Sequence, residues 1–453
     1  MSQRKVHLLF IIIFCAVAFT VNGQIVKDKV HFSKEEKDLY TLVEKQTFEY
    51  FWDGAEPTSG MARERFHVDG VYPDNDKNVV TTGGSGFGVM AILAGINQKF
   101  ITRDEGRKRF EKIVSFLEKA DRFHGAWSHW IYGETGKVKP FGRKDNGGDL
   151  VETSFMLQGL LCVRQYFKNG SAEEKDLAKR IDNLWKEVDF DWFRNGKNVL
   201  YWHWSPEYNW EMNFAVTGYN ECLIMYILAA SSPTHPVAAE VYHEGWAKSG
   251  AIKNTATSTT KYGHTLQLSH NGAIEYGGPL FWTHYSYLGL DPHGLKDKYA
   301  NYWEENKNQA LINHDWCADN PKKYKGYGTN NWGLTASYSV KGYAAHSPGN
   351  KDLGVISPTA ALSSFPYTPQ YSMLAMRHWY NDMKDKLWGP YGFYDAFSET
   401  DDWYPQKYLA IDQGPIVVMM ENYRSGLLWK LFMSCPEVKA GLKKLNFQSP
   451  YLK

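Results

Sequence analysis

Cysteine is scarce in this chain of 453 residues, which contains only five. One of them, Cys15, lies in an apolar run near the N-terminus. The other four are far apart in the sequence and form no CxxC pair; they are Cys162, Cys222, Cys317 and Cys435. This spacing argues against both a disulfide framework and a zinc site. Three of these four lie in apolar helical contexts, so we expect buried free thiols.

The chain also lacks an excess of charge of either sign. Its 51 basic and 50 acidic side chains give a formal net charge of +1. Such a balance offers no electrostatic attraction for nucleic acid or for an anionic membrane surface. Beyond the N-terminal segment, no stretch is long and apolar enough to cross a membrane. We therefore expect neither partner, and we expect the protein to be a monomer.

Several catalytic motifs are missing as well. The sequence contains no HExxH and no GxSxG, and the glycine-rich stretch GGSGFG at 83–88 is not followed by the Lys-Ser/Thr of a phosphate loop. His264, His270 and His284 lack the spacing of metal ligands. The sequence therefore predicts no cofactor and no metal.

The N-terminal residues 1–23 have the pattern of a secretory signal peptide. Arg4 and Lys5 precede an apolar run from Leu8 to Val21, and small residues close the segment before Gln24. The run is too short and wrongly flanked for a spanning helix. Because no small-residue box precedes Cys15, a lipid anchor is not favoured. We expect a secreted protein with a periplasmic location and a single domain over 24–453.

What the chain does have is aromatic side chains, which make up 15% of it, with 17 Trp and 29 Tyr. Many lie beside Gly, Asn, Asp and His rather than within apolar runs. A flat apolar ring next to hydrogen-bonding groups suits a sugar, whose C–H faces are apolar and whose edges carry hydroxyls. A large aromatic core is the alternative, and we favour sugar binding.

Helical periodicity recurs along the chain, whereas alternating strand patterns are scarce. It predicts twelve helices and a short extra one, over 34–52, 84–97, 103–122, 149–168, 171–188, 212–230, 235–248, 279–290, 295–317, 357–365, 369–384, 412–433 and 436–444. Short and long connections alternate between them. Long loops are uncommon in compact domains unless they build a functional site, so we expect the six long ones to lie on one face.

The helices that follow the long loops differ from the others. They open with small residues, as in GGSGFG at 83–88 and DQGP at 412–415, and are apolar all round. The helices after short connections are charged and amphipathic, as outer helices are. The pattern predicts an all-α fold, an (α/α)6 toroid of six inner and six outer helices. An α-solenoid is the alternative, but it would not need long loops on one side only.

Carboxylates gather at the starts of the predicted inner helices. In KDNGGDLVET, at 144–153, Asp149 occupies an N-cap position that keeps it ionised, and Glu152 lies at the capping-box position. Capping alone would explain both residues. Asp145 precedes the helix on the loop face, and capping does not account for it. Asp412 opens the last inner helix, where an N-cap is again the alternative.

Glu221 lies in TGYNECLIMYIL, directly before strongly apolar residues. Such surroundings raise a carboxyl pKa and favour the protonated form. One protonated and one ionised carboxyl are what glycosidic cleavage requires, and an inverting enzyme holds them roughly 6.5–9.5 Å apart. Neighbouring helices are about 8–10 Å apart, so Glu221 can pair with an acid on another helix. Asp149 and Glu152 lie on one helix, about 5–6 Å apart at Cβ, and are less suited to pair with each other.

Five stretches resemble a known family: TGGSGFGVMAI, HWIYGETGKVKPFGRKDNGGDLVETSFMLQGLL, EMNFAVTGYNECLIMYILAASSPTHPV, GGPLFWTHYSYLGLDP and NNWGLTAS. They resemble the bacterial glucoamylase-like domain proteins of glycoside hydrolase family 144. The resemblance implies an (α/α)6 barrel that hydrolyses β-1,2-glucan with inversion, either within the chain or by releasing sophorose from an end. It implies that Glu221 is the proton donor. The base stays open among Asp145, Asp149 and Asp412, acting directly or through a water or a substrate hydroxyl.

We expect the substrate-binding residues to come from the same loops and helix starts: Glu152, Arg143, Trp130, Tyr219, Trp204, Trp332 and Gln413. Two other kinds of protein fit the pattern less well. A non-catalytic glycan-binding surface protein would not need acids at several helix starts. Another (α/α)6 enzyme, such as a lyase or an epimerase, is the second alternative, but a lyase acting on uronic acids would need more Tyr, His and Arg than these near-neutral loops offer.

Overall fold

The computed structural model describes residues 30–453, apart from 254–259 and 272–274. The predicted signal peptide, with Cys15, lies outside the described residues. Residues 33–453 form one compact unit. Within the described ranges, no helix has both the length and the apolar character that a membrane span requires.

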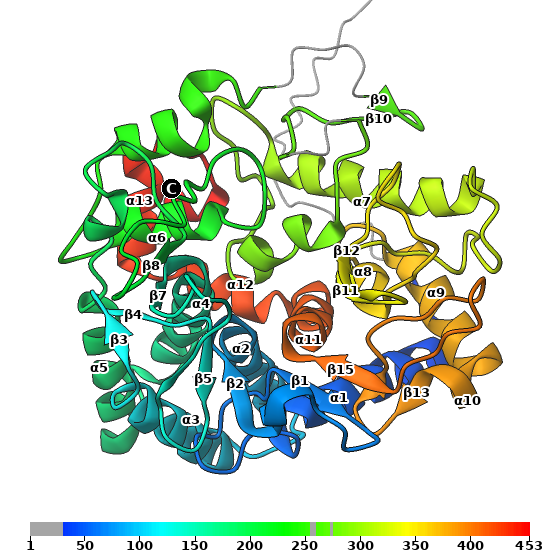
Figure 1. Ribbon diagram of the computed structural model, residues 1–453, viewed down its shortest axis with the longest axis horizontal. Coiled ribbons are helices and arrows are strands. Elements are labelled where there is room, and N and C mark those ends of the chain that lie inside the picture. Colours follow the sequence, from blue (N-terminus) through cyan, green and yellow to red (C-terminus); the bar gives the residue numbers. More distant parts are fainter. Residues whose placement is uncertain (1–29, 254–259, 272–274) are drawn as a thin grey trace, which may run out of the picture. The chain divides into compact units, whose positions relative to one another are not determined.

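Helices dominate this unit (Figure 1). The α-helices are α1 Lys34–Trp52, α2 Thr82–Asn97, α3 Arg103–Leu117, α4 Leu150–Phe167, α5 Ala172–Lys186, α6 Leu223–Ser231, α7 Tyr302–Asp319, α8 Pro358–Leu362, α9 Pro369–Asp382, α10 Lys384–Leu387, α11 Ala410–Ser425, α12 Leu427–Met433 and α13 Pro436–Lys444. Shorter helical turns are η1 Pro73–Asn78, η2 Trp192–Arg194, η3 Val241–Trp246, η4 Lys248–Gly250, η6 Leu280–Thr283, η7 Tyr285–Leu288 and η8 Pro450–Leu452. The prediction of a mostly helical fold is confirmed.

Short antiparallel strands connect the helices. They are β1 Arg65–His67, β2 Val79–Thr81, β3 Arg122–Phe123, β4 Ala126–Trp127, β5 Trp130–Tyr132, β6 Val138–Lys139, β7 Gly148–Asp149, β8 His203–Trp204, β9 Thr260–Lys261, β10 His264–Thr265, β11 Ala336–Ser339, β12 Gly342–Ala345, β13 Trp388–Gly389, β14 Gly392–Phe393 and β15 Lys407–Leu409. Strand β5 lies between β2 and β6. Strand β1 pairs with β15, so that Arg65 faces Leu409 and the first long loop meets the last.

Helices α2, α4 and α11 pack side by side at the centre, with α2 between the other two (Figure 1). Every residue of α2 from Thr82 to Ile96 is buried. Glycines let α2 and α4 approach closely: a Cβ added at Gly86 would lie 2.4 Å from the Phe155 carbonyl oxygen, and one at Gly159 would lie 2.2 Å from the Gly86 oxygen. These contacts leave no room for a side chain, which explains the small residues in the sequence.

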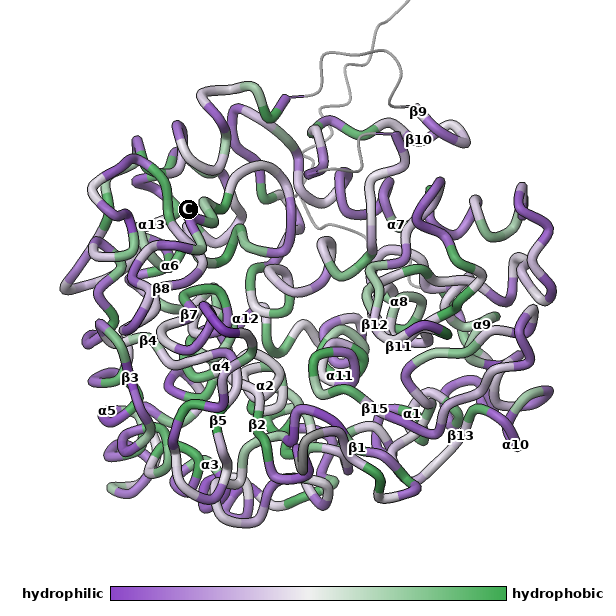
Figure 2. Tube along the Cα trace, in the orientation of Figure 1, coloured by the Kyte–Doolittle hydropathy of each residue, from purple (hydrophilic) through white to green (hydrophobic). Residues whose placement is uncertain are grey.

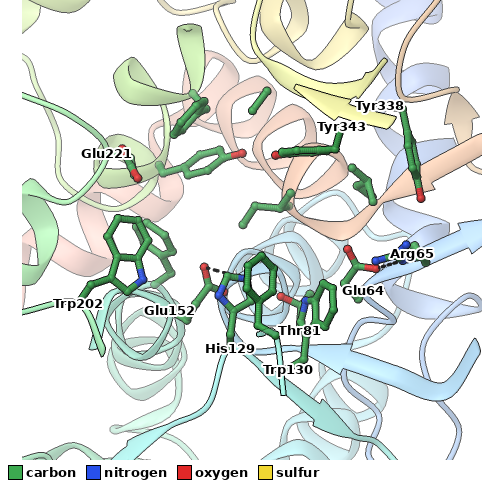
Figure 3. Close-up of a pocket in the computed structure, with 17 residues that line it drawn as sticks. Glu64, Arg65, Thr81, His129, Trp130, Glu152, Trp202, Glu221, Tyr338 and Tyr343 are labelled. Atoms are coloured by element: carbon green, nitrogen blue, oxygen red, sulfur yellow. Dashed lines mark hydrogen bonds and ion pairs between the residues drawn. The ribbon is translucent and has the colours of Figure 1, made fainter. Parts of the chain in front are cut away.

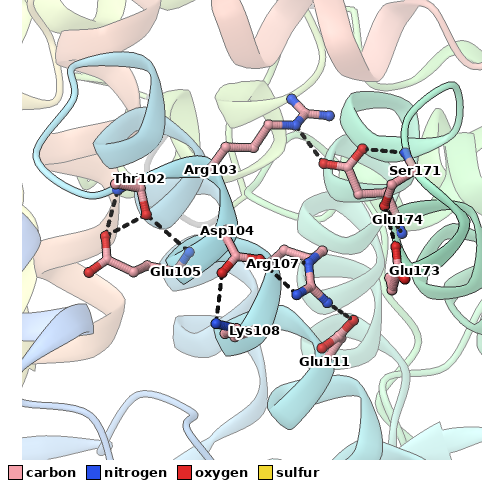
Figure 4. Close-up of polar contacts among 10 residues, drawn as sticks. All are labelled: Thr102, Arg103, Asp104, Glu105, Arg107, Lys108, Glu111, Ser171, Glu173 and Glu174. Atoms are coloured by element: carbon pink, nitrogen blue, oxygen red, sulfur yellow. Dashed lines mark hydrogen bonds and ion pairs between the residues drawn. The ribbon is translucent and has the colours of Figure 1, made fainter.

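Helices α3 and α5 have the charged, amphipathic character predicted for outer helices. Each begins with a complete capping box, Thr102 with Glu105 and Ser171 with Glu174. Figure 4 shows how Arg103 of α3 reaches Glu174 of α5, with Nε 2.6 Å from Oε1. In Figure 2 the trace of α11 is mainly hydrophobic, whereas that of α5 is largely hydrophilic. Exposed ion pairs of this kind add little stability, so the buried apolar faces hold these helices in place.

Several predicted helices are shorter or divided. The segment predicted over 412–433 breaks at Gly426, whose φ of +68° ends α11 in the left-handed conformation. The segment predicted over 279–290 forms two 3-10 turns, η6 and η7, on either side of His284. The segment predicted over 235–248 forms the π-helical turn η3 and, at its end, the start of the 3-10 turn η4.

Candidate active site

A cavity of about 370 Å³ opens where several helices begin (Figure 3). Its lining residues are Glu64, Arg65, Thr81, His129, Trp130, Phe141, Glu152, Phe155, Trp202, Glu221, Phe281, Tyr285, Ala336, Tyr338, Tyr343, Leu409 and Ile411. Most are aromatic or apolar, with a few polar groups among them, as in sites that bind small organic ligands. Three lining side chains are carboxyls.

The starts of five helical segments bring this lining together. Thr81 is the N-cap of α2, and Glu152 lies in the first turn of α4. Glu221 lies two residues before α6, and Tyr285 opens η7. Ile411 is the second residue of α11. Helix starts carry free backbone N–H groups and a partial positive charge, and both features favour carboxylates at this end.

Asp149 is the N-cap of α4, as predicted. Its Oδ1 accepts a hydrogen bond from the Glu152 backbone N–H at 2.9 Å. Its Oδ2 accepts from Trp202 Nε1 at 3.0 Å and lies 3.1 Å from His129 Nδ1. Burial would raise the pKa of this carboxyl, but the hydrogen bond from His129 and the charges of His203 and His129 hold it below its usual range. Asp149 is therefore ionised, and its side chain is fully occupied behind the cavity lining.

Glu152 does not complete the capping box that the sequence predicted. Its Oε2 instead accepts a hydrogen bond from the Gly83 backbone N–H at 2.7 Å, which ties the start of α4 to the start of α2. Burial raises the pKa of Glu152 to about 7, with Asp149 adding to the shift and His129 opposing it. The carboxyl lines the cavity and carries a proton for part of the time at neutral pH.

His129 lies between these two acids. Burial opposes its protonation, but the charges of Glu152 and Asp149 outweigh that cost and raise its pKa to about 9. His129 is therefore an imidazolium at neutral pH. Ligand atoms of His129, Asp145 and Asp149 lie within 4.8 Å of one another, a spacing that would suit a cation, but the protonated ring already supplies the positive charge.

Asp145 also belongs to this cluster of acids and histidines. Its Oδ2 lies 3.1 Å from His203 Nε2, and the residue is buried near the antiparallel pair of strands β7 and β8. Sequence reasoning assigned neither His129 nor His203 to the site. Nothing in their local sequence indicated that both would contact the acids of KDNGGDLVET.

Glu221 stands alone among the lining carboxyls. No basic side chain forms an ion pair with it within the described part of the chain, and burial raises its pKa to about 7. The apolar residues of α6, which run from Leu223 to Ser231, are all buried behind it. This is the setting that its sequence context predicted, and it keeps a large fraction of the carboxyl protonated at neutral pH.

Asp412 is not the N-cap of α11, because Leu409 occupies that position. Asp412 lies in the first turn, buried directly behind Tyr285 and Ile411. Burial raises its pKa well above the usual range, and the charge of Asp395 raises it further. A hydrogen bond from the Tyr285 hydroxyl acts in the opposite direction. Asp412 therefore does not line the cavity itself but contacts Tyr285, which does.

The chain matches a known protein family and several solved structures. Residues 213–436 match the family model described as "Putative glucoamylase". A solved endo-β-1,2-glucanase from Chitinophaga pinensis, in complex with sophorotriose and glucose, is 77% identical, with a TM-score of 0.91, over 93% of this chain and 100% of that chain. The chain belongs to glycoside hydrolase family 144.

Other members are less similar. A solved structure from Bacteroides caccae, described as a putative glucoamylase, is 65% identical over 91% of this chain and 100% of that one, with a TM-score of 0.89. The exo β-1,2-glucooligosaccharide sophorohydrolase (non-reducing end) of Parabacteroides distasonis is 48% identical over 429 residues, or 91% of this chain. The chain spans 58% of the length of that curated relative.

Two of the residues predicted to bind substrate in this family 144 chain, Trp130 and Glu152, line the cavity. Arg143 and Trp204 lie outside the lining. Arg143 Nε donates to the Tyr208 hydroxyl at 3.0 Å, and the Trp204 ring packs edge-on against His124, with centroids 5.1 Å apart.

The remaining three are part of the core, which corrects the prediction that they contact substrate. Trp332 is 0% exposed, and its Nε1 donates to the Tyr371 carbonyl at 3.3 Å. The buried Tyr219 hydroxyl donates to Asn306 Oδ1, and Gln413 Nε2 donates to the Phe393 carbonyl at 3.1 Å. Burial leaves none of these side chains a free face for a sugar.

Sequence reasoning missed much of the opposite wall of the cavity. Glu64 and Arg65 form an ion pair there, and the Arg65 guanidinium lies 5.4 Å from the Trp130 ring centroid (Figure 3). The Phe141 ring stacks on His129, with centroids 4.2 Å apart, and is 51% exposed. Such an exposed ring beside a charged group is the kind of surface that sugar faces contact.

Proposed function

We propose that this protein is an inverting β-1,2-glucan hydrolase that cleaves within the chain. The observation that carries the proposal is the identity of 77%, over the full length of the solved chain, with an endo-β-1,2-glucanase bound to sophorotriose and glucose. The cavity supports it, because a partly protonated carboxyl, aromatic rings and an imidazolium share one space. We also propose that the helices complete an (α/α)6 toroid, with α2, α4, α6 and α11 among its inner helices.

In this proposal Glu221 is the general acid. Its lack of a cationic partner and its pKa of about 7 leave the proton available for the leaving glycosidic oxygen. As the bond between the anomeric carbon and that oxygen breaks, the oxygen takes the proton and Glu221 becomes a carboxylate. The His129 imidazolium is placed to stabilise negative charge nearby.

Asp412 is the best candidate for the general base. Asp149 already accepts three hydrogen bonds, and Asp145 is held by His203 outside the cavity lining. Asp412 instead connects to the cavity through the Tyr285 hydroxyl. A water attacking the anomeric carbon passes its proton to the Tyr285 oxygen, while the Tyr285 proton passes to Asp412. Attack from the face opposite to Glu221 gives inversion.

The pH dependence of kcat/KM follows from the acid. Because Glu221 must be protonated and burial raises its pKa to about 7, we expect activity to fall as the pH rises through that value. The measurement is a profile of initial rates on β-1,2-glucan between pH 4 and 9. A rate that stays constant through pH 8 would contradict the assignment of Glu221 as the acid.

The function itself is tested by incubating the purified protein with linear β-1,2-glucan, laminarin and starch, then sizing the products and following the anomeric protons by NMR. We expect a ladder of oligosaccharides from β-1,2-glucan alone, released first as the α-anomer. Sophorose as the sole product would replace endo action by exo action. Binding of β-1,2-glucan without any product would favour a glycan-binding protein.

A further inference from the structure

A second pair of acids lies directly behind the cavity. Asp395 and Asp412 are 2% and 1% exposed, and their carboxyls are hydrogen-bonded to each other. They come from different parts of the fold, because Asp395 follows β14 whereas Asp412 lies in the first turn of α11. Burial raises the pKa of both carboxyls, and the contact between them raises the pKa of Asp412 further while it lowers that of Asp395.

One oxygen of each carboxyl has no other donor. Asp395 Oδ1 and Asp412 Oδ2 are buried, and no N–H or O–H group of the described residues donates a hydrogen bond to either. Two buried carboxylates, each with one oxygen that lacks a donor, would be costly, because each would lose hydration and repel the other. A single proton between the two oxygens removes both penalties.

Two backbone hydrogen bonds fix Asp395 in place. Its backbone N–H donates to the Lys407 carbonyl at 2.9 Å, next to the strand that leads into α11. Its other carboxyl oxygen, Oδ2, accepts from the Tyr338 backbone N–H at 2.8 Å. Strands β11 and β15 therefore hold the residue from two sides. Asp412 is in turn hydrogen-bonded to Tyr285, which lines the cavity.

The other ionisable groups around the pair are accounted for. Glu64, beside β1, interacts electrostatically with both acids and disfavours further negative charge, while its own partner is Arg65. The phenols of Tyr285, Tyr338 and Tyr343 approach from η7, β11 and β12. None of these groups is a cation in contact with Asp395 or Asp412, so a shared proton is the simplest way to balance their charge.

We propose that Asp395 is the terminal proton acceptor of the base assembly, and that it shares one proton with Asp412 in the resting enzyme. This inference rests on the proposed hydrolysis. When the attacking water passes a proton through Tyr285 to Asp412, the proton between the two acids moves onto Asp395. The pair then carries two protons and no charge, Glu221 carries the negative charge that its proton left behind, and exchange with solvent restores the starting state.

The test compares Asp395→Asn with wild type in pH profiles of kcat and kcat/KM on β-1,2-glucan. The amide keeps the shape of the Asp395 carboxyl and can donate a hydrogen bond to Asp412, but it cannot take up the transferred proton. Without the Asp395 charge, Asp412 ionises at lower pH and is a weaker base. We expect kcat to fall about tenfold or more with KM little changed, and the acidic limb, near pH 6 in wild type, to move to lower pH. An unchanged acidic limb in an active, folded variant overturns the proposal.

A second measurement needs no activity. Because the folded pKa values of the pair are raised, the stability that it contributes is complete at low pH and is lost as the pH rises through about 6. The Tm of wild type should therefore fall over this range by more than the Tm of Asp395→Asn, and Asp412→Asn should behave in the same way. Equal pH dependence in all three proteins would overturn the shared proton.

Asp352→Asn is the matched control. Asp352 is 1% exposed and accepts hydrogen bonds from Trp316 Nε1 and the Tyr327 hydroxyl, both at 2.8 Å, but it does not line the cavity. Its loss should lower the Tm without moving the acidic limb. If wild type does not cleave β-1,2-glucan, the proposed function fails, whereas the Tm comparison still decides whether the two acids share a proton.

Discussion

Replacing Glu221 by Gln is expected to lower kcat on β-1,2-glucan by about 10²- to 10⁴-fold, the usual contribution of a general acid. The amide has nearly the shape of the protonated carboxyl, and no ion pair of the described residues depends on Glu221. The Tm and the affinity for β-1,2-glucan should therefore stay close to wild type. Initial rates, thermal unfolding and calorimetric binding measure the three quantities.

A substrate with a better leaving group makes this test specific. A dinitrophenyl sophoroside needs no proton on its departing phenolate, so Glu221→Gln should lose far less activity on it than on the polymer. Glu275→Gln is the control, since Glu275 is an exposed loop acid 2.7 Å from Lys261 and lies outside the cavity lining. Equal losses on both substrates would mean that Glu221 acts through binding rather than proton transfer.

The second large effect concerns stability. Asp149→Ala removes the N-cap of α4 and leaves the His129 imidazolium and Trp202 Nε1 without their acceptor. Removing one partner of a buried ion pair costs about 3–5 kcal/mol, and we expect a loss of unfolding free energy near the lower end, since His129 retains some exposure. Urea unfolding at pH 7 measures it. Hydrolysis should be lost as well, because His129 and Trp202 line the cavity.

The pH dependence of the unfolding free energy provides a control for this prediction. The pKa of His129 is raised to about 9 in the folded state, above its usual 6.5, so the stability from its pairing is complete below about pH 6.5 and is lost as the pH rises through 9. Asp149→Asn keeps an N-cap oxygen and removes only the charge. The loss of unfolding free energy in this variant, relative to wild type, should therefore become smaller above pH 9. A deficit that is constant between pH 6 and 10 would show that His129 is not the partner that matters.

Local sequence patterns predict much of this structure. The small residues of GGSGFG predicted a helix that others approach closely, and Gly86 lies against the α4 backbone. The N-cap pattern located Asp149, and the apolar run after Glu221 predicted its raised pKa. Each of these properties depends on residues within one or two helical turns, which is the range over which sequence patterns are informative.

The features that sequence reasoning missed depend on distant contacts. Glu152 follows the capping-box spacing, yet its carboxyl accepts a hydrogen bond from Gly83 of α2, which packs directly against α4. His129 is an imidazolium because of acids in another part of the chain, Asp145, Asp149 and Glu152. Asp395 lies in an ordinary loop sequence, and its contact with Asp412 arises from the way β14, β15 and α11 meet.

The pairing of β1 with β15 has a consequence for biogenesis. Arg65 and Leu409, which line one wall of the cavity, are neighbours in space but are translated far apart in time. A nascent polypeptide that lacks its final helices can fold α2 and α4 against each other, yet it has no complete binding surface to offer. We therefore expect activity to appear only after the last part of the chain has been synthesised and has folded. Incomplete chains should show no activity on glucan.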